Sequence, residues 1–403
     1  MSSSKLQPNS SSVPLKNYVI SSKMKTAIAV CLFLGAAGFL IGLMRDPSRM
    51  WMAYLVAFFY FVSLSLGGLF FAAIQHVTKA GWSVNVRRVC ESFSGFIPFA
   101  AVAAGVFLIG APKLYSWLDS AKVASDHLLS HKEGYLNGPF FVIRLIAFFA
   151  IWLLFTKIIV GKSLAQDKSG DVSITHDLVK HGVIFILLFA VTYSFFTVDL
   201  IMSTEPHWFS TIFGVYCFAG LFQITMATMI ITILYLQKKG LLTGLVTEDH
   251  LHDLGKFLFA FTVFWAYIAF SQYMLIWYAN LPEETIFIIP RTEGAWLPVS
   301  LLLLIGKFIV PFFALLPRWA KRNPNHLMVV SVWTLIMQYV DIYWLVYPAY
   351  FHDHLEFGLY EICLFLGFLG LFLYAMTKFL SKNNLIPVKD PRLQESMHHH
   401  VVY

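Results

Sequence analysis

The stretch Met50 to Gln75, MWMAYLVAFFYFVSLSLGGLFFAAIQ, holds no charged residue and is long enough to cross a bilayer as an α-helix. Similar uncharged runs centre on Thr26 to Met44, Ser92 to Pro112, Gly182 to Val198, Trp208 to Gln237 and Phe257 to Pro282. Four further apolar runs carry a charged residue inside them: Gly138 to Val160, Ala295 to Leu316, His326 to Ala349 and Phe357 to Leu380. The sequence therefore predicts an all-α polytopic membrane protein with ten transmembrane helices.

The composition agrees with a chain embedded in lipid. Of the 403 residues, 58% are hydrophobic and only 13% are charged, and the mean hydropathy is +0.69. Long segments this apolar are typical of transmembrane helices. The connections between the predicted spans are too short for a water-soluble catalytic domain, so we expect the function to reside in the membrane.

The basic residues predict how the chain is oriented. Most of the 29 Lys and Arg residues fall in the two terminal segments and in every second connection between the predicted spans. Lys and Arg accumulate on the cytoplasmic side of a membrane, so both termini are predicted to be cytoplasmic. The chain then divides into a polar head at residues 1–23, a ten-helix membrane domain at 24–380 and a cytoplasmic tail at 381–403. The net charge of +7 follows from this topology and does not indicate nucleic-acid binding.

Two short sequence similarities suggest an internal repeat. The sequence Gly67-Gly68-Leu69-Phe70 in the second span resembles Ala219-Gly220-Leu221-Phe222 in the sixth, and the pair Asp199 and Pro206 resembles Asp341 and Pro348. An offset of four spans preserves helix direction. These similarities predict two four-helix bundles of the same orientation, one of spans 2–5 at residues 50–202 and one of spans 6–9 at residues 207–349. The first and last helices are predicted to flank the two bundles. Chance similarity is the alternative.

Four cysteines lie in or beside different predicted spans: Cys31, Cys90, Cys217 and Cys363. They form no CxxC or CxxCH motif, which argues against a ferredoxin-type cluster or covalently attached haem. We therefore expect no metal held by this chain, and we expect any redox metals to belong to partner proteins.

Ionisable residues inside the predicted spans are the main functional signal. Each costs about 2.5–3.5 kcal/mol to insert into a bilayer, so such residues often line proton or ion routes. The pattern predicts two polar half-channels for protons, one entering from each face, and it predicts no catalytic residue. The outer half-channel is predicted to contain Arg144, Asp199, Glu205, His207, Asp341 and Glu361. The inner half-channel is predicted to contain His76, His181, His252, Asp253, Lys256 and Lys307.

Structural alternatives remain for these residues. Arg144 cannot usefully deprotonate and would hold a carboxylate, so its pairing with Asp199 or Asp341 could be a structural link between helices. His76 and His181 lie at one predicted depth and could instead ligate a b-type haem. Asp253 near a helix start suits the helix dipole as well as a proton-entry role.

A quinone site is a weaker expectation. The run from Gln272 through Tyr273 to Trp277 could line an apolar quinone cleft. Aromatic residues at the end of a span also serve as interfacial anchors, and that reading stays open beside the first.

Several motifs together resemble one family of membrane subunits. They are Gly67 to Phe71 with Gln75-His76, Arg87-Arg88, the turn Met202-Ser203-Thr204-Glu205-Pro206-His207-Trp208-Phe209, the helix His252 to Lys256, the stretch Trp277 to Glu284, and Asp341-Ile342-Tyr343-Trp344. They resemble the NrfD-like integral subunits of bacterial alternative complex III, and in particular the smaller of its two NrfD-like subunits.

The resemblance implies a multi-pass subunit of the bacterial inner membrane that works in a respiratory chain. Such a subunit is not catalytic alone but belongs to a quinol:cytochrome c oxidoreductase complex. The implied partners are the larger NrfD-like sister, an iron-sulfur subunit, multihaem cytochrome c subunits and small membrane subunits. Haem c and iron-sulfur clusters would lie on those partners, and quinone or menaquinone is the ligand to consider for this chain.

Two other functions stay open. A secondary transporter would also have ten spans, a repeat and buried charges. Transporters typically interrupt helices near the membrane midplane, whereas Pro98, Pro298 and Pro311 lie nearer the ends of their predicted spans than the centres. A purely structural scaffold would explain the short connections but not the number of buried charges.

Overall fold

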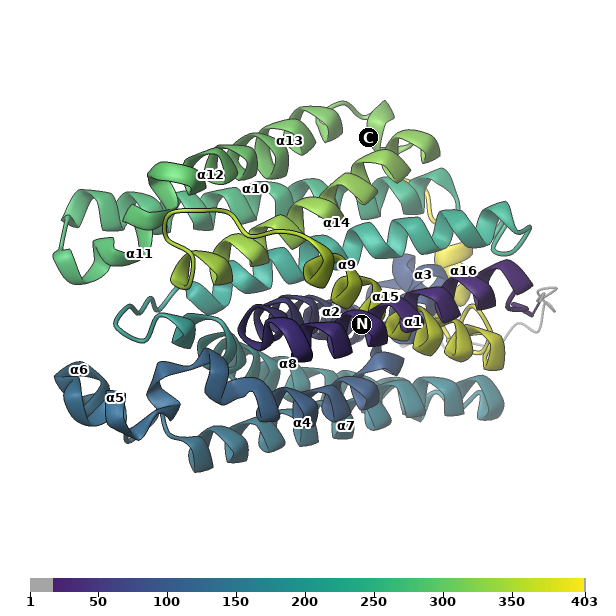
Figure 1. Ribbon diagram of the computed structural model, residues 1–403. Coiled ribbons are helices and arrows are strands. Elements are labelled where there is room, and N and C mark those ends of the chain that lie inside the picture. Colours follow the sequence, from purple (N-terminus) through teal and green to yellow (C-terminus); the bar gives the residue numbers. More distant parts are fainter. Residues whose placement is uncertain (1–16, 402–403) are drawn as a thin grey trace.

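The computed structural model describes residues 17–401 as a helical bundle with ten segments that are long and apolar enough to cross a membrane (Figure 1). No strand occurs among these residues. The ten-span, all-α prediction is confirmed. The part of the predicted polar head up to residue 16 lies outside the described residues.

The spans are formed by the longer helices. They are α1 (Ser22–Arg45), α2 (Pro47–Val77), α3 (Val84–Phe93) with α4 (Ile97–Leu114), α7 (Gly138–Ser169), α8 (Ser173–Leu200), α9 (Phe213–Lys238), α10 (Glu248–Ala279), α12 (Leu297–Leu302) with α13 (Val310–Leu315), α14 (Pro324–Val346) and α15 (Leu359–Lys382). Four shorter helices lie between or after them: α5 (Ser120–Ser125), α6 (His127–Lys132), α11 (Pro282–Thr292) and α16 (Leu393–Met397).

The bundle has two polar ends. The end that carries the turns after α2, α7, α9 and α13 also carries the C-terminal segment 383–401, and we call it the tail face. Contacts between these segments define it: Lys389 Nζ donates to the Lys168 carbonyl, and Asn85 Nδ2 donates to the Leu245 carbonyl. The opposite end, which we call the loop face, carries the turns after α1, α4, α8, α10 and α14. There the Tyr115 hydroxyl donates to the Leu200 carbonyl.

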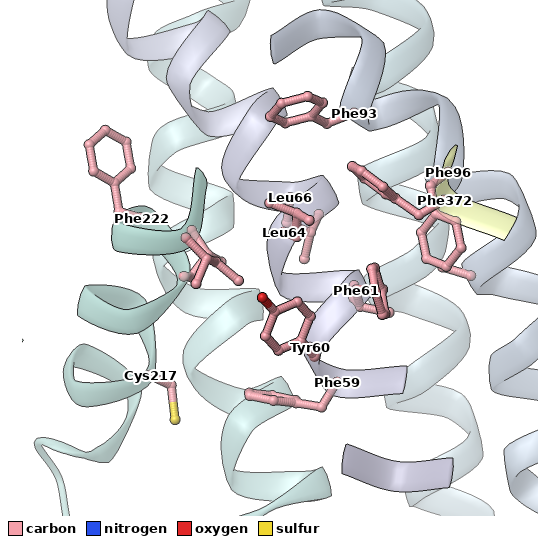
Figure 2. Packing of buried hydrophobic residues seen from close by; sticks show 14 of the residues in the cluster. Phe59, Tyr60, Phe61, Leu64, Leu66, Phe93, Phe96, Cys217, Phe222 and Phe372 are labelled. Carbon is pink, nitrogen blue, oxygen red and sulfur yellow. The ribbon is translucent and has the colours of Figure 1, made fainter. Parts of the chain in front are cut away.

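Helix α2 lies at the centre of the bundle. Its most apolar window is 94% buried, against 22% for that of α1, because α2 packs against α4, α8, α9, α14 and α15. Figure 2 shows Phe59, Tyr60 and Phe61 of this helix pointing into the packed interior. A helix that is apolar on every side is expected to be buried all round, and the uncharged stretch quoted first is that helix.

Glycines let the central helices approach closely. A Cβ on Gly67 would lie 1.9 Å from Thr225 Oγ1 of α9, and a Cβ on Gly68 would lie 2.5 Å from the Cys90 carbonyl of α3. Without a hydrophobic driving force between helices in lipid, such close packing is a main source of their association.

Short polar residues set the starts of several helices. Asp46 caps α2 through a hydrogen bond from the Arg49 amide, and Asn137 and Asn323 cap α7 and α14 in the same way. A proline occupies the first turn of each of these helices, where no backbone donor is needed.

The eighth span is interrupted at its centre, which differs from the sequence expectation. Residues Leu303–Ile309 form a π-helical segment between α12 and α13. Pro311 has no N–H to donate to the Lys307 carbonyl and its ring would clash there, so a wider turn is the physical solution. Trp333 Nε1 donates to the Gly306 carbonyl at 2.6 Å in this segment.

Two other boundaries differ from the predicted ones. The third span begins with a helical turn at Gly81, well before the predicted Ser92, and Arg87 and Arg88 are therefore inside the helical bundle. The sixth span, α9, begins at Phe213, so Trp208 lies in the preceding turn. The Trp208 ring stacks on the ring of Phe287 of α11, with 3.8 Å between the centroids.

The first and last spans, α1 and α15, pack on each other at glycines of both helices, and we call this contact the glycine seam. A Cβ on Gly35 would lie 2.3 Å from the Gly367 Cα, a Cβ on Gly38 would lie 2.4 Å from the Cys363 Cβ, and a Cβ on Gly370 would lie 2.9 Å from the Cys31 Cβ. Small residues spaced three or four apart are the usual device for such crossings.

Gly35→Leu should separate α1 from α15, because the new side chain has no room beside the Gly367 backbone. We expect a loss of at least about 2 kcal/mol, the size typical of overpacking, seen as a lower thermal midpoint in detergent. Gly161→Leu is the matched control, since a Cβ there meets no heavy atom within 4 Å. Equal midpoints for the two variants would contradict the seam.

Candidate functional site

The most unusual polar group in the spans is a lysine at the interrupted centre of the eighth. Lys307 has no exposed surface, and its Nζ donates to Asp341 Oδ2 at 2.5 Å and to Gln338 Oε1 at 2.6 Å. The Tyr216 hydroxyl of α9 donates to the other oxygen of Asp341. Lys307, Asp341, Gln338 and Tyr216, which we call the central cluster, thus form one hydrogen-bonded unit.

Neighbouring residues close the central cluster off from lipid. The Lys307 ammonium lies 4.1 Å from the ring centroid of Trp265 of α10, a distance at which the ring face attracts a cation. A Cβ on Gly220 would lie 2.6 Å from Gln338 Oε1, so only glycine leaves room for that amide beside Lys307. The site therefore depends on α9, α10, α14 and the π-helical segment together.

A second buried ion pair joins α7 to α8. Arg144 donates to both oxygens of Asp199, at 2.8 and 3.0 Å, and to the Tyr135 carbonyl at 2.9 Å. The guanidinium carbon lies 3.9 Å from the Tyr135 ring centroid and 4.4 Å from that of Phe140. This two-pronged geometry is the strong form of an Arg–carboxylate pair.

The two ion pairs occupy corresponding helices. Arg144 and Asp199 belong to the fourth and fifth spans, and Lys307 and Asp341 belong to the eighth and ninth. The cation is Arg in one pair and Lys in the other, which changes the chemistry. A guanidinium stays protonated at any physiological pH, whereas a lysine ammonium can release its proton when its surroundings favour that.

Glu361 lies at the loop face and is fully bonded. Arg49 donates to its two oxygens at 2.9 and 3.1 Å, and the Tyr347 hydroxyl and the Gly358 amide donate at 2.7 and 2.8 Å. The same Arg49 also pairs with Glu356 at 2.5 Å. These bonds fix the start of α15.

The remaining outer residues form separate pairs. Glu205 accepts from Arg291 at 2.7 Å, and Arg291 is fully buried and also donates to the Phe287 and Leu345 carbonyls. His207 contacts Asp126 at 2.6 Å on the exposed loop face, and this hydrogen bond is the main reason why the pKa of Asp126 is lowered. The six predicted outer residues are therefore divided among five ion pairs, and one of these pairs includes Lys307 from the predicted inner set.

The predicted inner residues are more scattered. His76 is fully buried, and neither ring nitrogen has a hydrogen-bond partner within residues 17–401. His181 is partly exposed on α8, with Nδ1 2.7 Å from the Asp177 carbonyl. At the start of α10, His252 accepts from Arg322, and Asp253 pairs with Lys256 at 2.5 Å and with His399 at 2.7 Å.

A dense charge network at the tail face was not expected from the sequence. Arg87, Arg88 and Glu91 of α3 have no exposed surface. Arg88 pairs with Glu91 and with Asp167 of α7, both at 2.7 Å, and Arg87 pairs with Asp390 of the C-terminal segment. Arg87 and Arg88 precede the predicted third run, which begins at Ser92, but their spacing of four and three residues from Glu91 is typical of a helix with internal ion pairs.

The network fastens the C-terminal segment to the bundle. The Asn85 amide donates to Ser396 Oγ at 3.2 Å, Ser396 Oγ donates to the Trp82 carbonyl at 2.7 Å, and the His399 ring lies 6.3 Å from that of Trp82. The segment 383–401 therefore covers the tail face beside Asp253 and His250.

The residues expected to line a quinone cleft point in different directions. Gln272 is buried, whereas Tyr273 is 41% and Trp277 66% exposed on the outer surface of α10. An apolar cavity exists elsewhere, between α2, α9, α14 and α15. Within residues 17–401, no three His, Cys, Asp or Glu side chains gather where they could hold a metal ion.

The fold and the site together define a multi-pass membrane protein whose spans contain buried, paired charges. No protein-family model and no curated protein matches the chain.

Removing the Asp390 charge should release the C-terminal segment. Burial raises the pKa of this carboxyl, but Arg87 together with the backbone amide and charge of Arg392 outweighs it, and the net pKa lies below its ordinary value. Because the folded pKa is the lower one, the carboxyl's contribution is complete above about pH 4 and is lost as the pH falls through the folded pKa. We expect Asp390→Asn to expose the segment to protease near pH 7, as acid does in the wild type.

Asp171→Asn is the control for this change, because its carboxylate is exposed and bonds only within its own turn. A protease pattern for Asp390→Asn identical to that of the control would show that the pair with Arg87 does not hold the segment. Breaking a buried pair from one side typically costs about 3–5 kcal/mol, so the difference should be large.

Proposed function

We propose that this protein is a membrane subunit of a respiratory quinol:electron-acceptor oxidoreductase, of the type of the smaller NrfD-like subunit of alternative complex III. Its role is to carry protons through polar half-channels that meet at the central cluster. Spans 2–5 and 6–9 act as two four-helix bundles in the bacterial inner membrane, and the tail face is cytoplasmic.

The central cluster is the observation that carries this proposal. Lys307, Asp341 and Tyr216 are all titratable and directly hydrogen-bonded. A proton can therefore pass among them by small movements of side chains without leaving a charge uncompensated in the bilayer. The π-helical segment supports the idea, because such segments occur frequently at functional sites and supply local freedom to the backbone.

Two groups of residues would connect the central cluster to water. On the tail face, Asp253, His252 and Lys256 lie at the entrance, with His399 of the C-terminal segment beside them. On the loop face, Glu205 and Arg291 lie at the end of α14, the helix that carries Asp341. The Arg144–Asp199 pair would be the equivalent of Lys307–Asp341 in the first bundle but would transfer no proton, because the guanidinium keeps its proton.

The electron-transfer part of the proposal rests on the resemblance in sequence. In such a complex, haem c and iron-sulfur clusters would be carried by the cytochrome and iron-sulfur partners and not by this chain. A quinone or menaquinone would contact this subunit near Gln272, with the exposed Tyr273 and Trp277 facing a partner or lipid.

A secondary transporter is the second candidate. The eighth span is broken at its centre by a π-helical segment next to Pro311, and the break carries a buried charge. Substrate sites of transporters are commonly built at broken helices near the membrane midplane. This observation favours transport more than the sequence did. A purely structural scaffold would account for Arg144–Asp199 and Glu361–Arg49 but gives no use to the central cluster.

Asp341→Asn should abolish proton transfer through the central cluster while the subunit still assembles, because an amide keeps the shape but cannot carry the proton. We expect the proton translocation of the purified complex in vesicles to fall at least tenfold per electron transferred. Asp177→Asn is the control, since its pair with Lys162 is exposed at the tail face. Undiminished translocation in an assembled Asp341→Asn complex would contradict the relay, and Lys307→Gln should repeat the loss.

Purification from the native membrane tests the assignment to a redox complex. We expect a chain extracted in mild detergent to bring along multihaem cytochrome and iron-sulfur proteins, identified by mass spectrometry and by a haem spectrum that quinol reduces. A colourless chain that purifies alone would contradict the assignment and would favour the transporter.

A further inference from the structure

An apolar cavity in the bundle has no role in the proposed proton route. It encloses about 480 Å³ between α2, α9, α14 and α15, and Tyr18 and Met24 at the start of the described chain border it. Aromatic and aliphatic side chains make up nearly all of its walls, among them Tyr60, Phe61 and Phe372, which lie near one another in Figure 2. We call this space the α15 cleft.

The α15 cleft runs the full height of the spans. Along α15 its lining begins at Glu361 and ends at Leu380. At 1.5 Å per residue these positions are about 28 Å apart, which is close to the hydrocarbon thickness of a bilayer, about 30 Å. A long apolar space in this position suits an extended hydrocarbon chain, since apolar cavities do not retain water.

The two ends of the cleft differ in charge. At the loop face, Glu361 uses both oxygens on Arg49, Tyr347 and its own helix start, and Glu356 shares the same arginine. This end offers a polar head group two carboxylates and a single, already bonded cation. An anionic head group would be repelled there.

The tail-face end is basic. The Lys239 ammonium lies 5.8 Å from the ring centroid of Tyr235, a lining residue. Lys23 and Lys25 flank the lining residue Met24, and Lys382 follows Leu380 by two positions; all four lysines are exposed. Basic residues near a membrane surface attract anionic lipid.

We propose that the α15 cleft binds an anionic phospholipid, with an acyl chain along the cleft and the phosphate among Lys23, Lys25 and Lys239. An acyl chain whose head group lies at the tail face fills the tail-face half of the cleft, because each leaflet spans about half of the hydrocarbon thickness. The charge difference between the two ends of the cleft decides which half is filled and carries this assignment. It holds whether the central cluster moves protons or another ion. The bound lipid fills the space between the first and second halves of the chain, where α2 meets α14 and α15.

Native mass spectrometry of the full-length chain tests the proposal. The chain is delipidated in mild detergent and mixed with phosphatidylglycerol or phosphatidylcholine of identical acyl chains. We expect at least tenfold stronger retention of phosphatidylglycerol. The triple change Lys23→Gln, Lys25→Gln, Lys239→Gln should remove this preference, and it alters only exposed side chains, so folding is not at stake.

Matched controls distinguish an effect at the cleft from the general effect of losing positive charge or of adding a large side chain. The triple change Lys157→Gln, Lys168→Gln, Lys180→Gln removes the same charge from exposed tail-face positions on α7 and α8 and should keep the preference. Ile231→Trp narrows the cleft and should abolish retention of either lipid, whereas Ile143→Trp, on the outer surface of α7, should not.

Three results would overturn the proposal. They are equal retention of the two lipids by the wild type, an unchanged preference in the Lys23, Lys25, Lys239 variant, and recovery of a quinone or a partner helix in place of phospholipid from the native material.

Discussion

Charge compensation inside a low-dielectric bundle is the constraint on which the rest of this structure depends. A lone ion in the membrane interior is far more costly than a paired one, and the buried cations Arg144, Lys307 and Arg291 each meet a carboxylate from another element. These pairs determine which helices can be neighbours. Arg144 requires α8 beside α7, and Lys307 requires α14 beside the broken eighth span.

The pairs are alike in geometry but not in chemistry. Arg144 and Arg291 keep their protons, so their partners Asp199 and Glu205 are compensated permanently. Lys307 and the Tyr216 hydroxyl each donate to one oxygen of Asp341, and all three groups are titratable. The structure therefore separates permanently compensated charges near the loop face from a titratable cluster in the interior, and the proposed proton transfer takes place at that cluster.

Close backbone approach and ion pairing act together. Gly67 and Gly68 allow α9 and α3 to contact α2, and Gly220 leaves the space in which Gln338 reaches Lys307. At the tail face the C-terminal segment is held by the pair of Arg87 and Asp390 and by the contact of His399 with Asp253. The α15 cleft is what remains where bulky side chains of α2, α9, α14 and α15 cannot fill the space between them.

The sequence alone determined the ten spans. A run of about twenty predominantly apolar residues is stable in lipid, and in lipid such a run satisfies its backbone hydrogen bonds as an α-helix. The sequence also located Arg144, Lys307, Asp341 and Glu361 inside apolar runs and Asp199 directly at the end of one, since a charge in or beside an apolar run is visible without coordinates. Only the tertiary structure decided the partners: Asp341 with Lys307 and Tyr216, Glu205 with Arg291, and Arg87 with Asp390, residues that lie 34 to 303 positions apart. Pairing is set by helix rotation and depth, which packing of small and large side chains fixes and which linear order does not encode.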